Sequence, residues 1–282
     1  MKRTRFVNLI ATLLLVLTTN TVAAQAQQKK PNDNPSQAGK KEVGIVAHRG
    51  FHKYDGSAEN SVYAMQLAVD HDFYGTEFDM QLTGDDVPVV FHDARLQGMA
   101  VGEVSHAQLM EHPGARLANG ETIPTLGIFM ESYAKAIRQQ QDRGKATRLF
   151  FEIKPLLKAE KNELAAAMAK EYVERYGLQQ QVCFISFSLD VCQSLRAIMP
   201  DADIAYLGGD RAPRELKHLG INGIDYNYKT LLEHPHWVAE AHELGMTVNV
   251  WTVNDAKIAL QMKELGVDLI TTDLPLEMTE LR

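Results

Sequence analysis

Acidic residues at matching positions in two segments indicate a metal site. Glu77 and Asp79 lie two residues apart in the apolar run Gly75–Asp79, and on a strand this spacing points both side chains to one face. Glu152 and Lys154 repeat the spacing at the end of a later apolar run. Three converging carboxylates need a cation, because unneutralised like charges raise one another's pKa. Ligation by oxygen alone favours one hard divalent ion, Mg²⁺ or Ca²⁺, over zinc.

A structural interpretation of these acids is also open: one of them would pair with Lys154 and the others would be solvated. Two histidines at similar positions favour the functional interpretation, since His48 and His92 each directly follow an apolar run. Two imidazoles can act as an acid–base pair, one taking a proton from the nucleophile and the other protonating the leaving oxygen. The remaining eight of the ten histidines lack such a setting and are interpreted as surface or structural residues.

The residues beside these candidates suit a phosphate group. Arg49 follows His48 directly, and its planar guanidinium matches a phosphoryl oxygen, while Lys154 adds a further positive charge. Trp251 ends another apolar run and has two interpretations, stacking on the substrate or filling the core near the site. The segment 271–273, Thr-Thr-Asp, is expected to shape the site without a catalytic role.

These candidates need a scaffold that gathers the ends of several strands. Eight strand-like runs alternate with helical patterns such as Lys158–Tyr176, Leu189–Ile198 and Asp255–Leu265, which predicts an α/β fold of the (β/α)₈ TIM-barrel type. A doubly wound open sheet is the alternative, but no Gly-rich phosphate fingerprint follows the first strand. The predicted strands are Gly44–Ala47, Gly75–Asp79, Arg148–Ile153, Val182–Ser186, Asp203–Leu207, Gly223–Tyr226, Thr247–Trp251 and Asp268–Thr272.

One further run, Val87–Phe91, predicts a β-hairpin after the second barrel strand. The turn before it is too short for a parallel crossover of about a dozen residues, so this strand returns antiparallel. A two-residue loop places residue 92 opposite residue 77 or residue 79, and either register brings His92 beside an acid. Residues 94–123 then predict a small insertion over the barrel mouth, with one short helix at Ser105–Glu111.

The first 26 residues have the pattern of a signal peptide. A positive start precedes a short apolar stretch and the small-residue sequence Ala24-Gln25-Ala26. A membrane span needs about 20 apolar residues, so an uncleaved anchor is the weaker alternative. Residues 27–41 predict a disordered tether, and residues 42–282 the barrel domain. We therefore expect export, most simply to a bacterial periplasm, without stable membrane insertion after cleavage.

Charge and cysteine content exclude some functions. The formal charge of −7 becomes −10 when the three basic residues of the predicted signal are removed. An acidic chain without a basic cluster argues against nucleic-acid partners, whose binding requires neutralised phosphates. Cys183 and Cys192 are the only cysteines and show no zinc-site spacing, which predicts buried free thiols. The sequence does not indicate an oligomeric state.

The motifs together resemble the glycerophosphodiester phosphodiesterase family. They run in the family's order over nearly all of the predicted mature chain: His48-Arg49-Gly50, Glu59-Asn60, Glu77 and Asp79 with Thr83 and Asp85, His92-Asp93, GEVS from Gly102, IPTL from Ile123, Glu152 with Lys154, WTVN from Trp251 and TTDLP from Thr271. The resemblance implies metal-dependent hydrolysis of glycerophosphodiesters to sn-glycerol 3-phosphate and an alcohol. It places the divalent cation on Glu77, Asp79 and Glu152, general acid–base catalysis on His48 and His92, and a phosphate clamp on Arg49.

The departures from the family pattern bear on the substrate rather than the reaction. Ala58 and Ser61 stand where the family usually has Pro and Thr, and residues 94–99 (ARLQGM) replace an Arg-Thr-Thr run. A lysophospholipase D-type enzyme acting on lipid diesters is one alternative, with Leu96, Met99 and Val101 as a candidate apolar strip. A catalytically silent periplasmic binding barrel is the other, although no expected ligand or histidine is missing. The nucleophile is either water or the substrate's adjacent hydroxyl.

Overall fold

A computed structural model describes residues 42–156 and 159–280 of the chain. The predicted signal peptide (1–26) and tether (27–41) lie outside the described residues. Within the described ranges, no helix has both the length and the apolar character that a membrane crossing requires.

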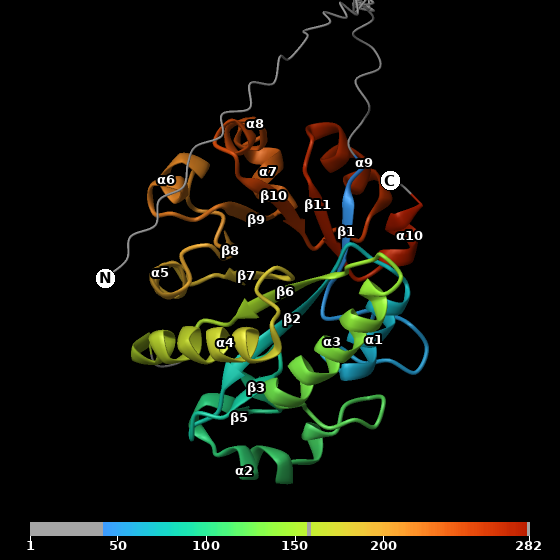
Figure 1. The fold of residues 1–282 in the computed structure, drawn as a ribbon, viewed down its shortest axis with the longest axis vertical. Coiled ribbons are helices and arrows are strands. Elements are labelled where there is room, and N and C mark those ends of the chain that lie inside the picture. Colours follow the sequence, from blue (N-terminus) through green and yellow to red (C-terminus); the bar gives the residue numbers. More distant parts are fainter. Residues whose placement is uncertain (1–41, 157–158, 281–282) are drawn as a thin grey trace, which may run out of the picture. The chain divides into compact units, whose positions relative to one another are not determined.

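Eight parallel strands in the described residues close into a barrel, which confirms the predicted TIM-barrel class (Figure 1). The first strand, β1, pairs with β2 on one side and with β11 on the other. The eight parallel strands therefore form a closed ring without a free edge. The barrel strands are β1 (Gly44–Ala47), β2 (Gly75–Leu82), β6 (Arg148–Ile153), β7 (Val182–Ser186), β8 (Asp203–Tyr206), β9 (Gly223–Asn227), β10 (Thr247–Trp251) and β11 (Leu269–Thr272).

Helices connect the strands, and several of them begin at a residue whose side chain caps the first turn. The Asp255 side chain accepts hydrogen bonds from two backbone N–H groups of α9, which ends at Gly266 in the left-handed conformation (φ +95°), close to the predicted bounds. The helices are α1 (Val62–Asp70), α3 (Leu126–Gln141), α4 (Asn162–Tyr176), α5 (Leu189–Ile198), α6 (Pro213–His218), α7 (Tyr228–Glu233), α8 (His236–Glu243), α9 (Ala256–Leu265) and α10 (Pro275–Thr279).

The hairpin exists, but both predicted registers are wrong by one residue. Strand β3 (Pro88–Val90) pairs antiparallel with β2, with Met80 opposite Val90, so the register extends to place residue 92 opposite residue 78. The turn has three residues, because Thr83 and Val87 pair across it and Asp86 adopts a positive φ of 64°. His92 still reaches the barrel mouth, since β3 ends at Val90 and the last backbone hydrogen bond to β2 comes from the Phe91 N–H, which donates to the Asp79 carbonyl oxygen at 3.0 Å.

The insertion contains more structure than the single predicted helix. It holds β4 (Arg95–Leu96), β5 (Met99–Ala100), two short 3₁₀ turns (Val101–Glu103 and Pro113–Ala115) and α2 (His106–Glu111). Leu96 and Val101 are buried in the insertion's own apolar cluster, and Met99 packs against that cluster. The apolar strip that a lipid diester would need is therefore not formed by these three side chains, because they fill the insertion's core.

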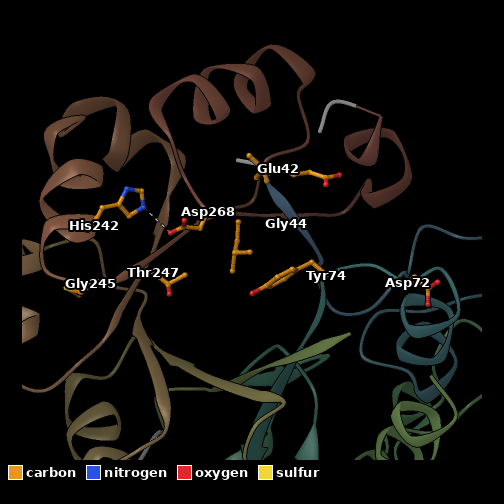
Figure 2. Close-up of a pocket in the computed structure, with 11 residues that line it drawn as sticks. Glu42, Gly44, Asp72, Tyr74, His242, Gly245, Thr247 and Asp268 are labelled. Carbon is orange, nitrogen blue, oxygen red and sulfur yellow. Dashed lines mark hydrogen bonds and ion pairs between the residues drawn. The ribbon is translucent and has the colours of Figure 1, made fainter. Parts of the chain in front are cut away.

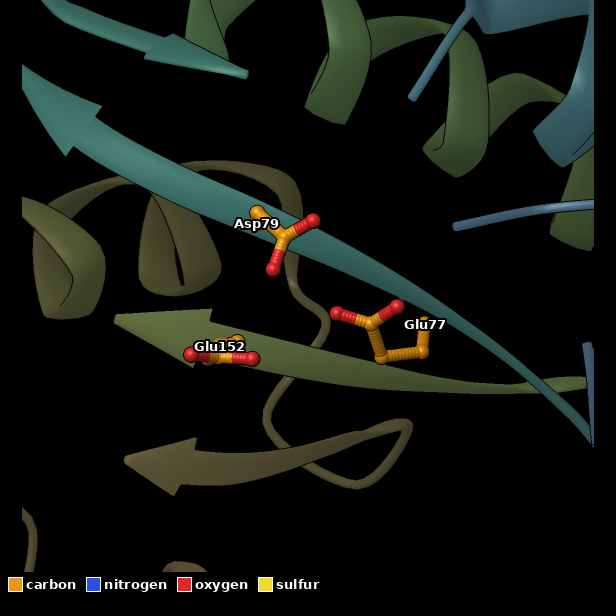
Figure 3. Close-up of side chains that lie close together, drawn as sticks. All are labelled: Glu77, Asp79 and Glu152. Atoms are coloured by element: carbon orange, nitrogen blue, oxygen red, sulfur yellow. The ribbon is translucent and has the colours of Figure 1, made fainter. Parts of the chain in front are cut away.

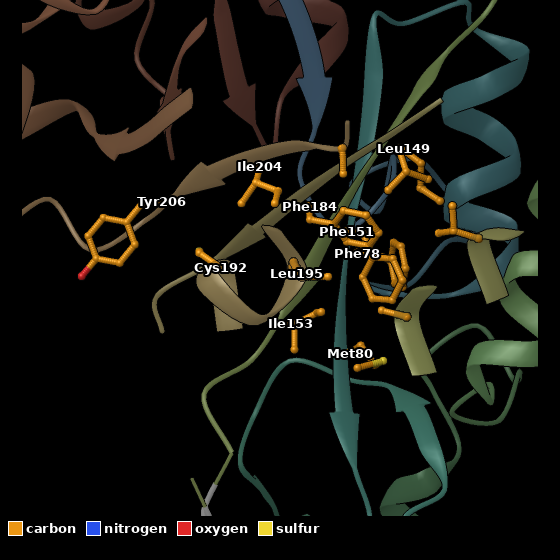
Figure 4. Packing of buried hydrophobic residues seen from close by; sticks show 14 of the residues in the cluster. Phe78, Met80, Leu149, Phe151, Ile153, Phe184, Cys192, Leu195, Ile204 and Tyr206 are labelled. Carbon is orange, nitrogen blue, oxygen red and sulfur yellow. The ribbon is translucent and has the colours of Figure 1, made fainter. Parts of the chain in front are cut away.

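The alternation of side chains along β2 separates the core from the site. Phe78, between the two acids, points away from them and packs 4.5 Å (ring centroids) from Phe129 of α3 and 4.5 Å from Phe151 of β6 (Figure 4). This apolar layer between strands and helices anchors the strand that carries the acids. Both cysteines are free thiols, as predicted, although Cys183 is only partly buried by accessible surface.

Replacing Phe78 by Ala removes this anchor. We expect Phe78→Ala to lower the free energy of unfolding by about 3–5 kcal/mol, the usual loss for a buried aromatic ring. Denaturant unfolding of the metal-free protein measures the change. The matched control is Ile128→Ala on α3, whose side chain is 57% exposed and should alter stability by no more than about 0.5 kcal/mol. Equal losses in the two variants would contradict this packing.

Candidate active site

The three predicted metal ligands meet at the carboxyl end of the barrel strands. Glu77 and Asp79 extend from β2 toward Glu152 on β6, the strand that pairs with it (Figure 3). All three side chains are buried, and one carboxylate oxygen from each lies within 4.8 Å of the other two. The predicted convergence of the acids is therefore present in the described structure.

The charge in this cluster is only partly balanced by the protein. The Lys154 ammonium Nζ lies 2.9 Å from Asp79 Oδ1 and 2.8 Å from Glu152 Oε1. Glu77 Oε1 has no hydrogen-bond partner among the described residues. Arg49 Nε also lies 3.8 Å from Asp79 Oδ2, but this guanidinium is paired with Glu59. With both pairs counted, two formal negative charges stay unbalanced, so a single divalent cation with oxygen preference fits both the charge and the donor set.

The protonation of these acids reflects that imbalance. Burial raises the pKa of Glu77 well above its usual range, and the charges of Asp79 and Glu152 raise it further. Burial, followed by the charge of Asp79, raises the pKa of Glu152 to about 8. Burial also opposes ionisation of Asp79, but the Lys154 ammonium outweighs it and holds the Asp79 pKa at about 2. A cation that binds here near neutral pH must therefore displace a proton from Glu152.

The turn after β1 holds Glu77 through the backbone. The Arg49 N–H donates to Glu77 Oε2 at 2.7 Å, and the Gly50 N–H donates to the Glu77 carbonyl oxygen at 3.0 Å. Arg49 and Gly50 both have positive φ, +53° and +79°. A Cβ at Gly50 would lie 2.6 Å from Ala64 Cβ, so only glycine fits this turn.

The Glu59-Asn60 segment positions Asp79 and Arg49. The Asn60 side chain donates to Asp79 Oδ2 at 2.7 Å and accepts from the Asp79 N–H at 3.1 Å. Glu59 Oε2 accepts from Arg49 Nη1 at 2.6 Å, which fixes the guanidinium beside the acid cluster. Neither contact was predicted, because the strand pattern does not extend into this loop.

His48 is oriented by a residue that sequence reasoning left without a role in the chemistry. Its Nδ1 lies 2.7 Å from Asp273 Oδ1, just after β11, and Asn254 donates to Asp273 Oδ2 at 2.7 Å. Burial opposes ionisation of Asp273, but hydrogen bonding to His48 holds its pKa at about 2, so the carboxylate accepts and Nδ1 carries the proton. The other ring nitrogen of His48, Nε2, is then unprotonated in the neutral ring and can accept a proton. His52 is structural: its side chain is buried, and its Nδ1 lies 2.9 Å from the His48 carbonyl oxygen.

His92 lies across the same cavity in a more open setting. Its Nδ1 is 2.7 Å from Oδ1 of the neighbouring Asp93, an exposed carboxylate. Burial lowers the pKa of His92, and the charge of Lys154 lowers it further, against the opposing effect of Asp79.

One cavity of about 120 Å³ unites the predicted site. Its lining includes seven of the eight predicted site residues: His48, Arg49, Glu77, His92, Glu152, Lys154 and Trp251. Asp79 is the predicted residue that does not line it. Trp251 forms part of that wall: its Nε1 donates to the Asp225 carbonyl oxygen at 2.8 Å, and its ring meets Phe187 edge-on at 5.5 Å. Trp251 also packs against an apolar cluster inside the barrel, so its position is compatible with both the stacking and the core-filling interpretation.

Asp225 on β9 is a further acid in this cavity that the sequence did not single out. Its side chain is 1% exposed, and Oδ2 accepts from Asn249 Nδ2 at 3.0 Å. Its other oxygen, Oδ1, has no hydrogen-bond partner among the described residues. Burial raises the pKa of Asp225 to about 7.

A larger hollow of about 500 Å³ lies at the opposite end of the barrel, where strands β1, β10 and β11 begin (Figure 2). Its lining includes Glu42, Tyr74 and an ion pair of His242 Nε2 with Asp268 Oδ2 at 3.1 Å. None of the predicted site residues reaches it. Barrel enzymes place their chemistry at the carboxyl ends of the strands, so we assign the reaction to the smaller cavity despite its size.

Asp225 makes stability depend on pH. A carboxyl group whose pKa is raised on folding, here to about 7, binds more protons when folded, so its contribution is full at low pH and is lost as pH rises. Relative to the wild type, Asp225→Asn should therefore gain stability between about pH 4 and pH 7, by up to about 1.4 kcal/mol per pH unit. Urea unfolding of both metal-free proteins across that range measures the difference. A difference that stays constant with pH would contradict the burial of an uncompensated carboxyl.

Comparison with known proteins agrees with this geometry. The sequence profile of the glycerophosphoryl diester phosphodiesterase family matches residues 48–277. A glycerophosphodiester phosphodiesterase of Bacillus altitudinis is 26% identical over 84% of this chain and 97% of its own length.

Solved structures show the same fold. The crystal structure of a glycerophosphodiester phosphodiesterase from Parabacteroides distasonis is 40% identical, with a TM-score of 0.79 over 86% of this chain and 98% of that one. A phosphodiesterase from Oleispira antarctica, solved in complex with its product sn-glycerol-3-phosphate, is 24% identical, with a TM-score of 0.68 over 84% of this chain and 95% of that one. Because the profile match begins at His48 and continues past Asp273, it spans most of the barrel and all the predicted site residues. The chain therefore belongs to the glycerophosphoryl diester phosphodiesterase family.

Proposed function

We propose that this enzyme hydrolyses glycerophosphodiesters to sn-glycerol 3-phosphate and an alcohol. The observation that carries the proposal is the single cavity that brings the acid cluster, two imidazoles and two cationic side chains together. The product held by the related Oleispira phosphodiesterase supports the identity of the phosphate-bearing product. Glu77, Asp79 and Glu152 would hold one divalent cation, Mg²⁺ or Ca²⁺, and His48 and His92 would perform acid–base catalysis.

Phosphate binding follows from the positive groups at the cavity wall. When bound, the cation supplies Lewis-acid stabilisation of charge on the phosphate oxygens. Arg49 presents a guanidinium already fixed by Glu59, so little rotamer freedom is lost when a phosphoryl oxygen binds. Lys154 adds a second positive charge from a buried position, where electrostatic interactions are stronger than in water.

Proton transfer is divided between the two histidines. His48 accepts the proton of the nucleophile at Nε2, because Asp273 keeps the proton of the neutral ring on Nδ1. His92 gives a proton to the leaving oxygen, and its lowered pKa makes the imidazolium a readier donor. The same division serves water or the substrate's adjacent hydroxyl as the nucleophile.

We also propose export to the periplasm. The support is the charge and hydropathy pattern of residues 1–26, together with the polar composition of residues 27–41.

Removing the metal ion should abolish turnover. Treatment with EDTA is expected to eliminate hydrolysis of glycerophosphocholine, and added Mg²⁺ or Ca²⁺ to restore it. Glu152→Gln should raise the metal concentration needed for half-maximal activity by at least about 10- to 100-fold, the loss seen when a residue that merely supports a ligand is removed. Glu131→Gln, an exposed change on α3, is the control. Full activity after thorough chelation would contradict the metal assignment.

Both histidines should be essential for turnover, and Asp273 should act together with His48. His48→Ala or His92→Ala should each lower kcat by about 10²–10⁴-fold, the usual contribution of general acid–base catalysis. Asp273→Asn should also lower kcat. The same substitution should have little further effect on kcat in a His48→Ala background, because the hydrogen bond of Asp273 to a histidine is made to the His48 ring. His242→Ala, at the far end of the barrel, is the control. Losses below tenfold in both histidine variants, or an additive Asp273 effect, would overturn the assignment.

A further inference from the structure

The active-site cavity is divided into two chemically different halves. Its charged residues come from β1, β2, β6 and the hairpin. The facing half is largely apolar, with Ile185, Phe187, Leu207 and Trp251 from β7, β8, β10 and the residues that follow these strands. Asp225 is the only acid in that second half among the described lining residues. It lies on β9, which stands four strands from β2 in either direction around the barrel and so directly across from the acid cluster.

The Asp225 carboxyl group accepts a hydrogen bond at one oxygen and has no partner among the described residues at the other. Asn249 Nδ2 donates to Oδ2 at 3.0 Å and also lies 2.9 Å from Thr271 Oγ1, while Trp251 Nε1 fixes the Asp225 carbonyl oxygen. Oδ1 is buried without a hydrogen-bond partner among the described residues. An unsatisfied buried carboxyl oxygen is destabilising, and its retention at the wall of a substrate cavity points to a ligand group that satisfies it.

We propose that Asp225 Oδ1 accepts a hydrogen bond from the terminal hydroxyl of the substrate's glycerol arm. The inference rests on the proposed function, in which the charged half holds the phosphate. An arm attached to that phosphate and retained in the cavity then extends across the barrel, with its carbon atoms against Trp251 and Phe187 and its far end at β9.

The size of the cavity agrees with this occupant. Its volume of about 120 Å³ is well below the roughly 300–1,000 Å³ of pockets for drug-sized ligands, which suits a three-carbon polyol and excludes an acyl chain. The other arm of the diester has a separate place. An open groove of about 420 Å³ shares Arg49 and His92 with the cavity and runs past Lys53 and Leu117.

The test uses two substrates that differ in one hydroxyl. One is sn-glycero-3-phosphocholine. The other is the phosphocholine diester of propane-1,2-diol, which lacks the terminal hydroxyl but keeps the one adjacent to the phosphate. The wild type should hydrolyse the second with a kcat/KM lower by about 10- to 100-fold, as expected for a lost hydrogen bond to a buried charged group. In Asp225→Ala, kcat/KM for the glycerol substrate should fall and the ratio between the two substrates should approach one.

Two further variants separate recognition from general damage. Leu207→Ala enlarges the apolar half and should lower kcat/KM for both substrates alike, leaving their ratio as in the wild type. In Asp225→Asn the amide oxygen must face the donor Asn249 Nδ2, so an NH₂ group replaces the accepting oxygen on the other side. The variant should therefore also lower kcat/KM for the glycerol substrate and reduce the ratio between the two substrates. It stands in for Asp225→Ala should thermal unfolding show that the alanine variant does not fold.

The outcomes distinguish this inference from the proposed function. Equal kcat/KM for both substrates in the wild type, or an unchanged ratio in folded Asp225→Ala, would overturn the role of Asp225. Should the wild type hydrolyse neither diester, the proposed function fails. In that case calorimetric titration with sn-glycerol 3-phosphate and with propane-1,2-diol 1-phosphate still tests the contact: a preference for the former that disappears in Asp225→Ala supports it, and the same preference in both proteins overturns it.

Discussion

The structure depends on the repulsion among three buried carboxylates at the tips of two neighbouring strands. Oxygens of Glu77, Asp79 and Glu152 lie within 4.8 Å of one another, and burial alone would drive all three to the protonated form. Lys154 compensates for only part of this charge and keeps Asp79 ionised, whereas the two glutamates retain raised pKa values. A divalent cation would complete the neutralisation, and the same arrangement of charge would suit an anionic phosphate diester beside it.

The rest of the barrel mouth holds that cluster in place. The turn at Arg49 and Gly50 binds Glu77 through backbone N–H groups, and Asn60 binds Asp79 through both ends of its amide. Outside the barrel, Phe78 anchors the same strand against the helices. His48 is secured from a third direction by Asp273. Because each functional group has its own supporting contact, the site is preorganised before substrate binds, which is how positioned charges become effective in catalysis.

Much of this arrangement could be predicted from the sequence, and the failures have physical reasons. The two-residue spacing of Glu77 and Asp79 fixes a shared face on any strand, so their convergence followed once the strands were found. The hairpin register was missed because its turn uses a positive φ at Asp86, which the local sequence did not reveal. Asp273 was expected only to shape the site, and its contact with His48 was missed because the two residues are 225 positions apart and only closure of the barrel makes β11 a neighbour of β1. Asp225 was missed because the hydrogen-bond partner that we propose for its free oxygen belongs to the ligand and not to the chain.

The most direct measurement is calorimetric titration of the metal-free protein with Ca²⁺ or Mg²⁺ near pH 7, in buffers of different ionisation enthalpy. We expect one ion to bind per chain and to displace protons from the glutamates into the buffer. We also expect Glu77→Gln to weaken binding strongly. The absence of binding, or binding that Glu77→Gln leaves unchanged, would contradict the claim that this acid cluster is a metal site.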